Sequence, residues 1–261
     1  MDILYQDKII NYIDNCTLDT FPHTVLIQGD KGGGKHLICN YISKKFGYDL
    51  IDITDNLTLE TITEIYLSTQ INFYLIDSDN ISVKEQNVIL KFLEEPCINA
   101  FILIINSYNQ LLNTIKNRCF KLSLNRYTKE QLQTFINQST NPLILQISTT
   151  PGQITEYINS DFDGMQEFAN KIFEHIKTAN ISNCLTIPNK IFFSKEEPDK
   201  YDINLFCMIL LYQSKFDYKV YNLTNQLVNN LYIPHINKKN LFEKYLVDLK
   251  LLLKSYEIRT T

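Results

Sequence analysis

The sequence predicts an α/β domain built on a parallel sheet, followed by a small helical unit and an all-α C-terminal region. In the first 125 residues, short apolar runs alternate with helical patterns. These runs are nearly continuous in Val, Ile, Leu, Phe and Tyr, which is typical of parallel strands buried on both faces. After Leu124 the strand signal fades and helical periodicity takes over. This alternation followed by helices predicts an α/β domain with helical additions.

Five strands are expected, each separated from the next by a helical pattern. They cover residues 24–28, 49–53, 72–76, 101–105 and 120–124. One intervening helix is expected to begin at Ser82, because Ser82 and Glu85 have the spacing of a capping box. Pro96 is expected to end that helix, since proline cannot continue it.

The rest of the chain is expected to form helices in two further domains. Residues 128–160 are interpreted as a short helical unit with breaks near residues 141–142 and 151–152. From Gly164 onward two apolar stripes at helical spacing predict core-facing helices. The stripes are Met165, Phe168, Ala169, Ile172, Phe173 and Ile176, and then Phe242, Tyr245, Leu246, Leu249, Leu252, Leu253 and Tyr256. The predicted division is residues 1–125, 126–162 and 163–261.

Charge and cysteine usage exclude some classes of protein. A net charge of −4 argues against a protein that coats DNA by itself. Residues 200–261 nevertheless carry nine Lys/Arg against five Asp/Glu, a local +4, which fits either a solvated helical face or a DNA- or partner-facing patch. The six cysteines form no CxxC pair and no zinc-like cluster, so no metal site is expected. Without an evident signal peptide or long apolar run, a cytoplasmic protein with no membrane contact is expected.

A glycine-rich loop between the first strand and the next helix predicts a phosphate-binding loop. It matches G-x-x-x-x-G-K-[ST] at every position but the last. Glycines let successive N–H groups turn toward phosphate oxygens, and the helix N-terminus and the lysine add positive charge. The residues expected to contact a nucleotide here are Gly29, Gly32, Gly33, Gly34, Lys35 and His36.

Two positions in this expected site lack the usual chemistry for hydrolysis. His36 stands where Ser or Thr supplies an oxygen to Mg²⁺, and a ring nitrogen is a poor ligand for that hard cation. Asp77 ends a buried apolar run, where its carboxylate is expected to hold the Mg²⁺ shell. Ser78 follows it and cannot act as a general base. The alternative is that Asp77 and Asp79 begin a turn.

At this point the sequence resembles the bacterial-type clamp-loader AAA+ subunits of DNA polymerase III, and among them delta-prime. The similarity covers roughly residues 5–160. Its most specific part is residues 90–96 (LKFLEEP), close to the family's L-L-K-x-L-E-E-P, followed by residues 114–119 (TIKNRC), close to T-I-x-S-R-C.

The resemblance implies an AAA+ core at 1–125, a helical lid at 126–162 and a collar at 163–261. It implies that Asn106 is the sensor-1 residue, and that Arg118 is an arginine finger reaching a neighbour's ATP. The sensor-2 arginine would fall near Thr155, and the four-cysteine zinc module found in many relatives has no counterpart here, because only Cys39 lies between Lys35 and Asp77. From the residues alone, Arg118 is equally a surface arginine paired with a carboxylate.

The expected function is a non-hydrolysing, delta-prime-like subunit of a sliding-clamp loader in DNA replication. Its expected partners are other AAA+ loader subunits in a hetero-oligomeric ring, the sliding clamp and primer–template DNA. ATP or ADP, with Mg²⁺ if nucleotide binds, is the only expected cofactor, and whether nucleotide binds is left open. The alternatives are an active AAA+ ATPase, either loader motor or remodeller, and a DNA-binding adaptor resembling a helicase loader.

Overall fold

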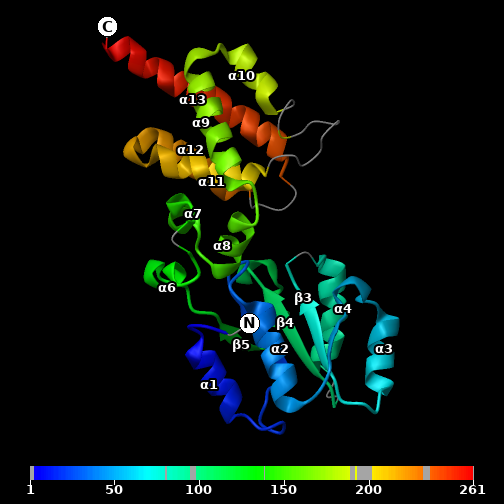
Figure 1. The fold of residues 1–261 in the computed structure, drawn as a ribbon. Helices are drawn as coiled ribbons and strands as arrows, with labels where there is room; N and C mark the ends of the chain where they lie inside the picture. The colour runs from blue at the N-terminus through cyan, green and yellow to red at the C-terminus, as the bar shows by residue number, and fades with distance from the viewer. Residues whose placement is uncertain are drawn as a thin grey trace. The chain divides into compact units, whose positions relative to one another are not determined.

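The computed structural model describes residues 3–79, 81–94, 98–137, 139–188, 192, 202–231 and 236–260 (Figure 1). The chain separates into two compact units. The N-terminal unit comprises Met1–Asn137 and Ser148–Glu156. The C-terminal unit comprises Gln138–Ile147 and Tyr157–Thr261. The finer division at residues 125 and 162 stays a prediction.

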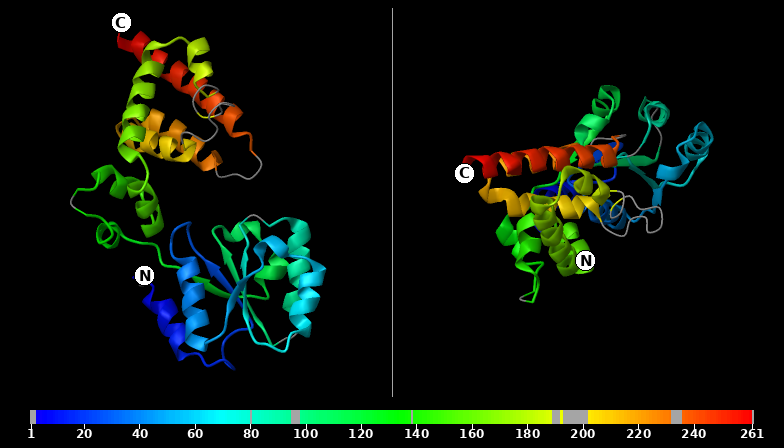
Figure 2. Two further views of the ribbon diagram at one scale, coloured as in Figure 1. Left: turned by 45° about the vertical axis from the view of Figure 1, so that its right-hand side comes forward. Right: turned by 90° about the horizontal axis from the view of Figure 1, so that it is seen from above.

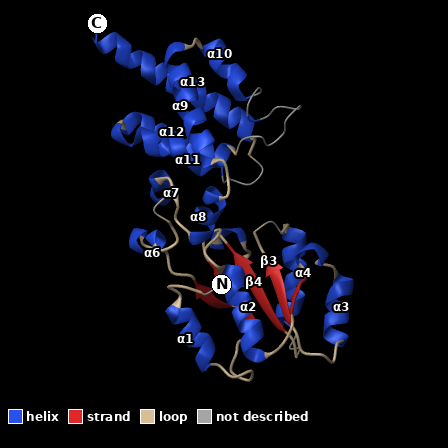
Figure 3. Cartoon of the chain, in the orientation of Figure 1, coloured by secondary structure: helices blue, strands red, loops and turns tan. Residues whose placement is uncertain are grey.

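A five-stranded parallel sheet forms the centre of the N-terminal unit, and Figure 3 shows the strands confined to this unit. The strands are β1 (Thr24–Gln28), β2 (Leu50–Asp52), β3 (Phe73–Asp77), β4 (Ala100–Ile105) and β5 (Phe120–Ser123). Their order is β2-β3-β4-β1-β5, and every neighbouring pair is parallel. The predicted α/β class and all five predicted strands are therefore confirmed, with boundary shifts of one residue at most.

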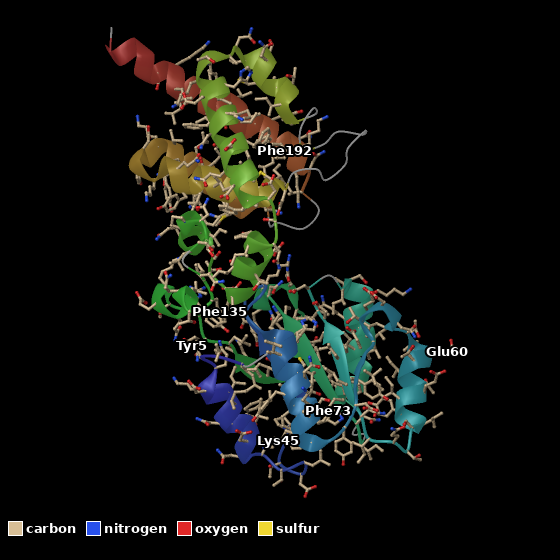
Figure 4. All side chains as sticks on the ribbon, viewed as in Figure 1. Tyr5, Lys45, Glu60, Phe73, Phe135 and Phe192 are labelled. Atoms are coloured by element: carbon tan, nitrogen blue, oxygen red, sulfur yellow. The ribbon has the colours of Figure 1, made fainter. Side chains whose placement is uncertain are left out.

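Helices cover both faces of the sheet because alternate strand residues point to opposite sides. α1 (Asp7–Asn15) and α2 (Lys35–Phe46) pack on the face that includes Val25, Phe73 and Ile104. α3 (Leu59–Leu67), α4 (Val83–Glu94) and α5 (Asn113–Lys116) contribute to the other face. Figure 2 shows this layering, and Phe73 is labelled within the packed interior in Figure 4.

The helix predicted from the capping box is α4. The Ser82 N–H donates to Glu85 Oε2 at 2.6 Å, and the Glu85 N–H donates to Ser82 Oγ at 3.3 Å. These reciprocal bonds satisfy two N–H groups at the start of the helix. α4 ends at Glu94. Pro96, predicted to end it, lies outside the described residues.

The described residues after β5 contain helices and no further strand. The helices are α6 (Lys129–Gln133), α7 (Pro142–Ile147), α8 (Pro151–Ile158), α9 (Phe162–Thr178), α10 (Ile181–Ile187), α11 (Ile203–Gln213), α12 (Tyr218–Leu231) and α13 (Lys238–Thr260). The two positions interpreted as breaks are helix starts at Pro142 and Pro151, because proline lacks an N–H and suits the first helical turn.

Aromatic and aliphatic side chains fill the core of the C-terminal unit. Phe192, labelled in Figure 4, lies 4.9 Å from Phe206 and 5.3 Å from Phe242 between ring centroids. Ala169 and Ile176 of the first predicted stripe are fully buried. In the second stripe Phe242, Tyr245, Leu246 and Leu249 are buried as well, so the described parts of both stripes face a core as predicted, whereas the side chain of Tyr256 is not among those described. None of the described helices has the length and apolar character needed to cross a membrane.

Candidate nucleotide site and arginine finger

The predicted nucleotide-site residues meet at one edge of the sheet. β1, β3 and β4 end at the same level, since Gln28 pairs with Ile105 and Asp77 pairs with Ile104. The phosphate loop leaves β1, Asp77 ends β3, and Asn106 follows β4. In open α/β sheets this carboxyl edge is where ligands bind.

Two glycines give the phosphate loop its shape. Gly32 has φ 78° and Gly34 has φ 102°, a left-handed region that side chains with a Cβ rarely adopt. Gly29 extends the sheet by donating its N–H to Ile105 O at 3.1 Å. The Gly33 N–H donates to Asp30 O at 3.0 Å, so one amide that could face a phosphate already has an acceptor.

Lys35 is bonded to the chain itself. Its Nζ donates to Gly29 O at 2.8 Å, to Asp30 O at 3.4 Å and to Asn106 Oδ1. An ammonium has three donor hydrogens, so these acceptors account for all of them. Lys35 as a whole residue is 7% exposed, and this burial lowers the pKa of its ammonium, opposed by the carboxylates of Asp79 and Asp77. Lys35 therefore ties the phosphate loop to the residue that follows β4.

Asp79 completes a polar network with Lys35 and Asn106. Asp79 Oδ1 accepts the Asn106 N–H at 2.6 Å, and Asp77 Oδ1 accepts the Asp79 N–H at 3.1 Å. Burial raises the pKa of Asp79, and the backbone bond from Asn106 and the charge of Lys35 oppose that rise. β3 ends at Asp77, so Asp79 lies in a turn and reaches β4. Asp77 and Asp79 thus begin a turn, as the alternative interpretation had it, and the predicted role of Asp77 in holding Mg²⁺ stays a prediction.

The positions of Ser78 and His36 fit poorly with hydrolysis. Ser78, which replaces the usual glutamate, is 2% exposed, and its Oγ has no hydrogen-bond partner among the described residues. His36 lies in the first turn of α2 and is exposed. Thr155, where the resemblance implies a sensor-2 arginine, is exposed on α8 and donates its hydroxyl to Pro151 O at 3.2 Å.

Residues 148–156 dock against the tip of the phosphate loop. The Gly152 N–H donates to Gly32 O at 3.0 Å, and Thr150 Oγ1 donates to Lys31 O at 2.9 Å. A Cβ added to Gly152 would lie 2.5 Å from Gly32 Cα, so only glycine permits this approach. On the other side, the Tyr127 hydroxyl donates to Gly33 O at 3.1 Å. The loop is thus held by two segments far from it in sequence.

The space beside the loop is small for a nucleotide. A cavity of about 160 Å³ opens there, lined in part by Asp30, Asn106, Arg126 and Thr150. Pockets for small organic ligands typically enclose about 300–1,000 Å³. With Lys35 bonded internally and a histidine at the Mg²⁺-ligand position, the residues do not fit ATP with Mg²⁺ in this arrangement. Among the described residues, no group of three or more His, Cys, Asp or Glu could hold a metal.

Arg118 lies away from these groups in sequence, between α5 and β5. Its Nη2 donates to Glu94 Oε1 at 2.9 Å and its Nη1 donates to Thr114 O at 2.9 Å. The Arg118 side chain is 37% exposed and that of Glu94 is 54% exposed. In the single chain Arg118 is thus a surface arginine paired with a carboxylate, and an exposed pair of this kind is weak enough to exchange partners.

Sequence reasoning missed the contacts that close the loop. Thr150 and Gly152 carried no signal beyond a proline–glycine pair that was interpreted as a break. Tyr127 followed a strand without any motif, although its ring also packs edge-on against Tyr5 and Phe135, which are labelled in Figure 4. Glu94 was noted only as part of residues 90–96, of which Glu95 and Pro96 lie outside the described residues.

The order of the parallel sheet, the phosphate loop after β1 and the helical C-terminal unit form the arrangement expected of an AAA+-type α/β protein. A model of the family described as DNA polymerase III, delta subunit, matches residues 51–128. The DNA polymerase III subunit gamma of Buchnera aphidicola subsp. Schizaphis graminum (strain Sg) is 25% identical over 233 residues, covering 72% of this chain. These matches support a clamp-loader-type subunit related to those of DNA polymerase III, as the motifs predicted.

The curated relative is longer than this chain, which spans 63% of its length. Among solved structures, the crystal structure of a DNA polymerase III gamma subunit-related protein from Thermotoga maritima MSB8 matches with a TM-score of 0.41 and 19% sequence identity. That match covers 87% of this chain and 78% of the other.

Proposed function

We propose that this chain is a non-hydrolysing, delta-prime-like member of a clamp-loader ring that offers Arg118 to the ATP of a neighbouring subunit. The observation that carries the proposal is the bonding of Lys35, whose ammonium donates to Gly29 O, Asp30 O and Asn106 Oδ1. Because its three donor hydrogens already have acceptors within the chain, Lys35 would have to exchange these bonds in order to contact a phosphate. The buried Ser78 supplies no base for an attacking water.

Arg118 supplies the chemistry of the proposed role. A guanidinium is planar, always charged and suited to stabilising negative charge on a transferring phosphoryl group. Arg118 is partly exposed and its partner Glu94 more so, so leaving Glu94 costs little. Residues 163–261 would serve as the collar, and the partners would be ATP-hydrolysing loader subunits, the sliding clamp and primer–template DNA.

The test is ATP hydrolysis by the reconstituted loader. Replacing Arg118 by Ala is expected to lower DNA-stimulated hydrolysis by about 10³-fold at the site it serves, the lower end of the range for arginine fingers. Lys35→Ala in the same complex is expected to leave hydrolysis unchanged, because the site it belongs to is idle. Unchanged hydrolysis with Arg118→Ala refutes the finger role, and hydrolysis by the isolated chain that Lys35→Ala abolishes would identify a motor subunit instead.

A further inference from the structure

Two lysines beside Arg118 are held against one aromatic ring. Tyr108 starts the 3-10 helix η2 (Tyr108–Gln110) and packs against the α4 and α5 side of the sheet. Lys121 Nζ lies 4.0 Å and Lys116 Nζ 4.9 Å from the centroid of the Tyr108 ring. The two ammonium groups are therefore no farther apart than the sum of these distances, about one Debye length at physiological salt.

The segment that carries these lysines is strongly basic. Residues 96–129 contain five Lys/Arg and no Asp or Glu. The segment carries +5 in a chain of −4, so the remaining residues carry −9. Three of these cations, Lys116, Arg118 and Lys121, lie within six consecutive residues spanning the end of α5 and the start of β5. β5 is an edge strand, and both Arg118 and Lys121 are exposed.

No carboxylate in the described part of the chain pairs with Lys116 or Lys121. Lys116 Nζ instead donates to Asn113 Oδ1 at 3.3 Å, and Lys121 is exposed. Two like charges held this close repel each other. Each cation–π contact with Tyr108 is worth only about 0.5–1 kcal/mol at an exposed site. An anionic group placed between the two ammonium groups would remove the repulsion and add charge-assisted hydrogen bonds.

We propose that Lys116 and Lys121, held by Tyr108, contact the phosphate chain of the nucleotide bound to the neighbouring subunit. The inference rests on the proposed function, because it places the lysines on the face that Arg118 would present. Arg118 lies two residues after Lys116 and three before Lys121, so a subunit that receives Arg118 would come close to both lysines. Lysine ammonium groups are compact charges suited to phosphate oxygens. A DNA backbone is a poorer occupant, since DNA-binding proteins typically neutralise about 6–10 phosphates and this corner offers three cations.

The experiment measures the affinity of the full-length chain for its ATPase partner subunit, with and without a non-hydrolysable ATP analogue. The double variant Lys116→Gln/Lys121→Gln is expected to reduce the nucleotide-dependent gain in affinity by about 3- to 10-fold, as two exposed charge contacts would. Affinity without nucleotide is expected to stay unchanged. Tyr108→Phe keeps the ring and should match wild type, whereas Tyr108→Leu keeps both charges and should give a partial loss.

A matched control removes two exposed lysines from the same unit, Lys8→Gln/Lys84→Gln, and should leave the gain intact. The proposal is overturned if the Lys116/Lys121 variant behaves like this control, or if it weakens only the binding of primed DNA. The Arg118→Ala variant distinguishes a failure of the lysine contact from a failure of the proposed arginine-finger role. If Arg118→Ala lowers hydrolysis while the lysine variant matches the control, only the lysine contact fails. If Arg118→Ala changes nothing, the finger role itself fails.

Discussion

Gly152→Ala is expected to destabilise the N-terminal unit by about 1–3 kcal/mol, the usual cost of overpacking a close contact. The added Cβ would lie 2.5 Å from Gly32 Cα and 2.8 Å from Gly32 O. Both are backbone atoms, so no side chain can rotate away to relieve the clash. Residues 148–156 must instead move off the phosphate loop, which breaks the bond from the Gly152 N–H to Gly32 O.

Alanine substitutions at two other glycines distinguish the cost of this contact from the cost of backbone strain. Gly47, after α2, has φ 73° and no described atom within 4 Å of an added Cβ, so Gly47→Ala measures the left-handed conformation alone, about 1–2 kcal/mol. Gly32 has φ 78°, and its Cβ would also meet Thr150 Oγ1 at 2.8 Å. Gly32→Ala therefore carries both costs, about 2–5 kcal/mol.

Urea unfolding of the full chain measures these differences, and thermal unfolding gives a second reading at about 2–4 °C per kcal/mol for a unit of this size. The double variant Gly32→Ala/Gly152→Ala is expected to cost less than the sum of the single changes, because one displacement relieves both clashes. A Gly152→Ala stability within 0.5 kcal/mol of wild type, or strict additivity, would refute the docking of residues 148–156 on the loop.

Three further changes test the site. Ser78→Ala should be neutral or stabilise the fold by up to about 1 kcal/mol, because it removes a buried hydroxyl with no described partner. Ser78→Glu should lower the free energy of unfolding in urea by about 3 kcal/mol or more, because it buries a charge. A stable Ser78→Glu chain that hydrolyses ATP would contradict this prediction. Burial raises the pKa of Asp79 above 3.8, so the folded state loses stability as pH rises from 3.8 through that raised pKa. Asp79→Asn keeps an acceptor oxygen, so its free energy of unfolding should rise relative to wild type over the same pH range. A difference in unfolding free energy that does not change with pH would contradict the raised pKa of Asp79. Glu94→Gln should change stability by less than about 1 kcal/mol yet raise loader hydrolysis by up to about 5-fold, since Arg118 no longer has to leave a carboxylate. A fall in hydrolysis would instead mean that Glu94 aligns Arg118.

Local patterns predicted most of the fold. The strands were found because residues buried on both sheet faces must be apolar throughout, as in residues 101–105. Ser82 and Glu85 predicted a helix start because the capping interaction is confined to four consecutive residues. The predicted breaks near Pro142 and Pro151 are confirmed, and each proline begins the helix that follows the break because it lacks an N–H.

The candidate site was predictable only where its motifs are continuous. The phosphate loop follows β1 and Asp77 ends β3, and the two lie at the same edge because the strands are parallel. The bonding of Lys35 to Asn106 joins residues 71 apart, and no pattern indicates that a lysine has found its acceptors within the chain. The direction of the Asp79 side chain depended on where β3 ends, because a shift of one residue along a strand changes the face to which a side chain points.

The docking of residues 148–156 on the phosphate loop also has a consequence for synthesis. Thr150 follows Lys31 by 119 residues. At translation rates of about 5–20 residues per second, the loop leaves the ribosome roughly 6–24 s before the segment that docks on it. During that interval the phosphate loop of the nascent chain lacks the contacts made by residues 148–156. An AAA+ partner or a free nucleotide meeting the chain then would encounter a different surface from that of the finished protein.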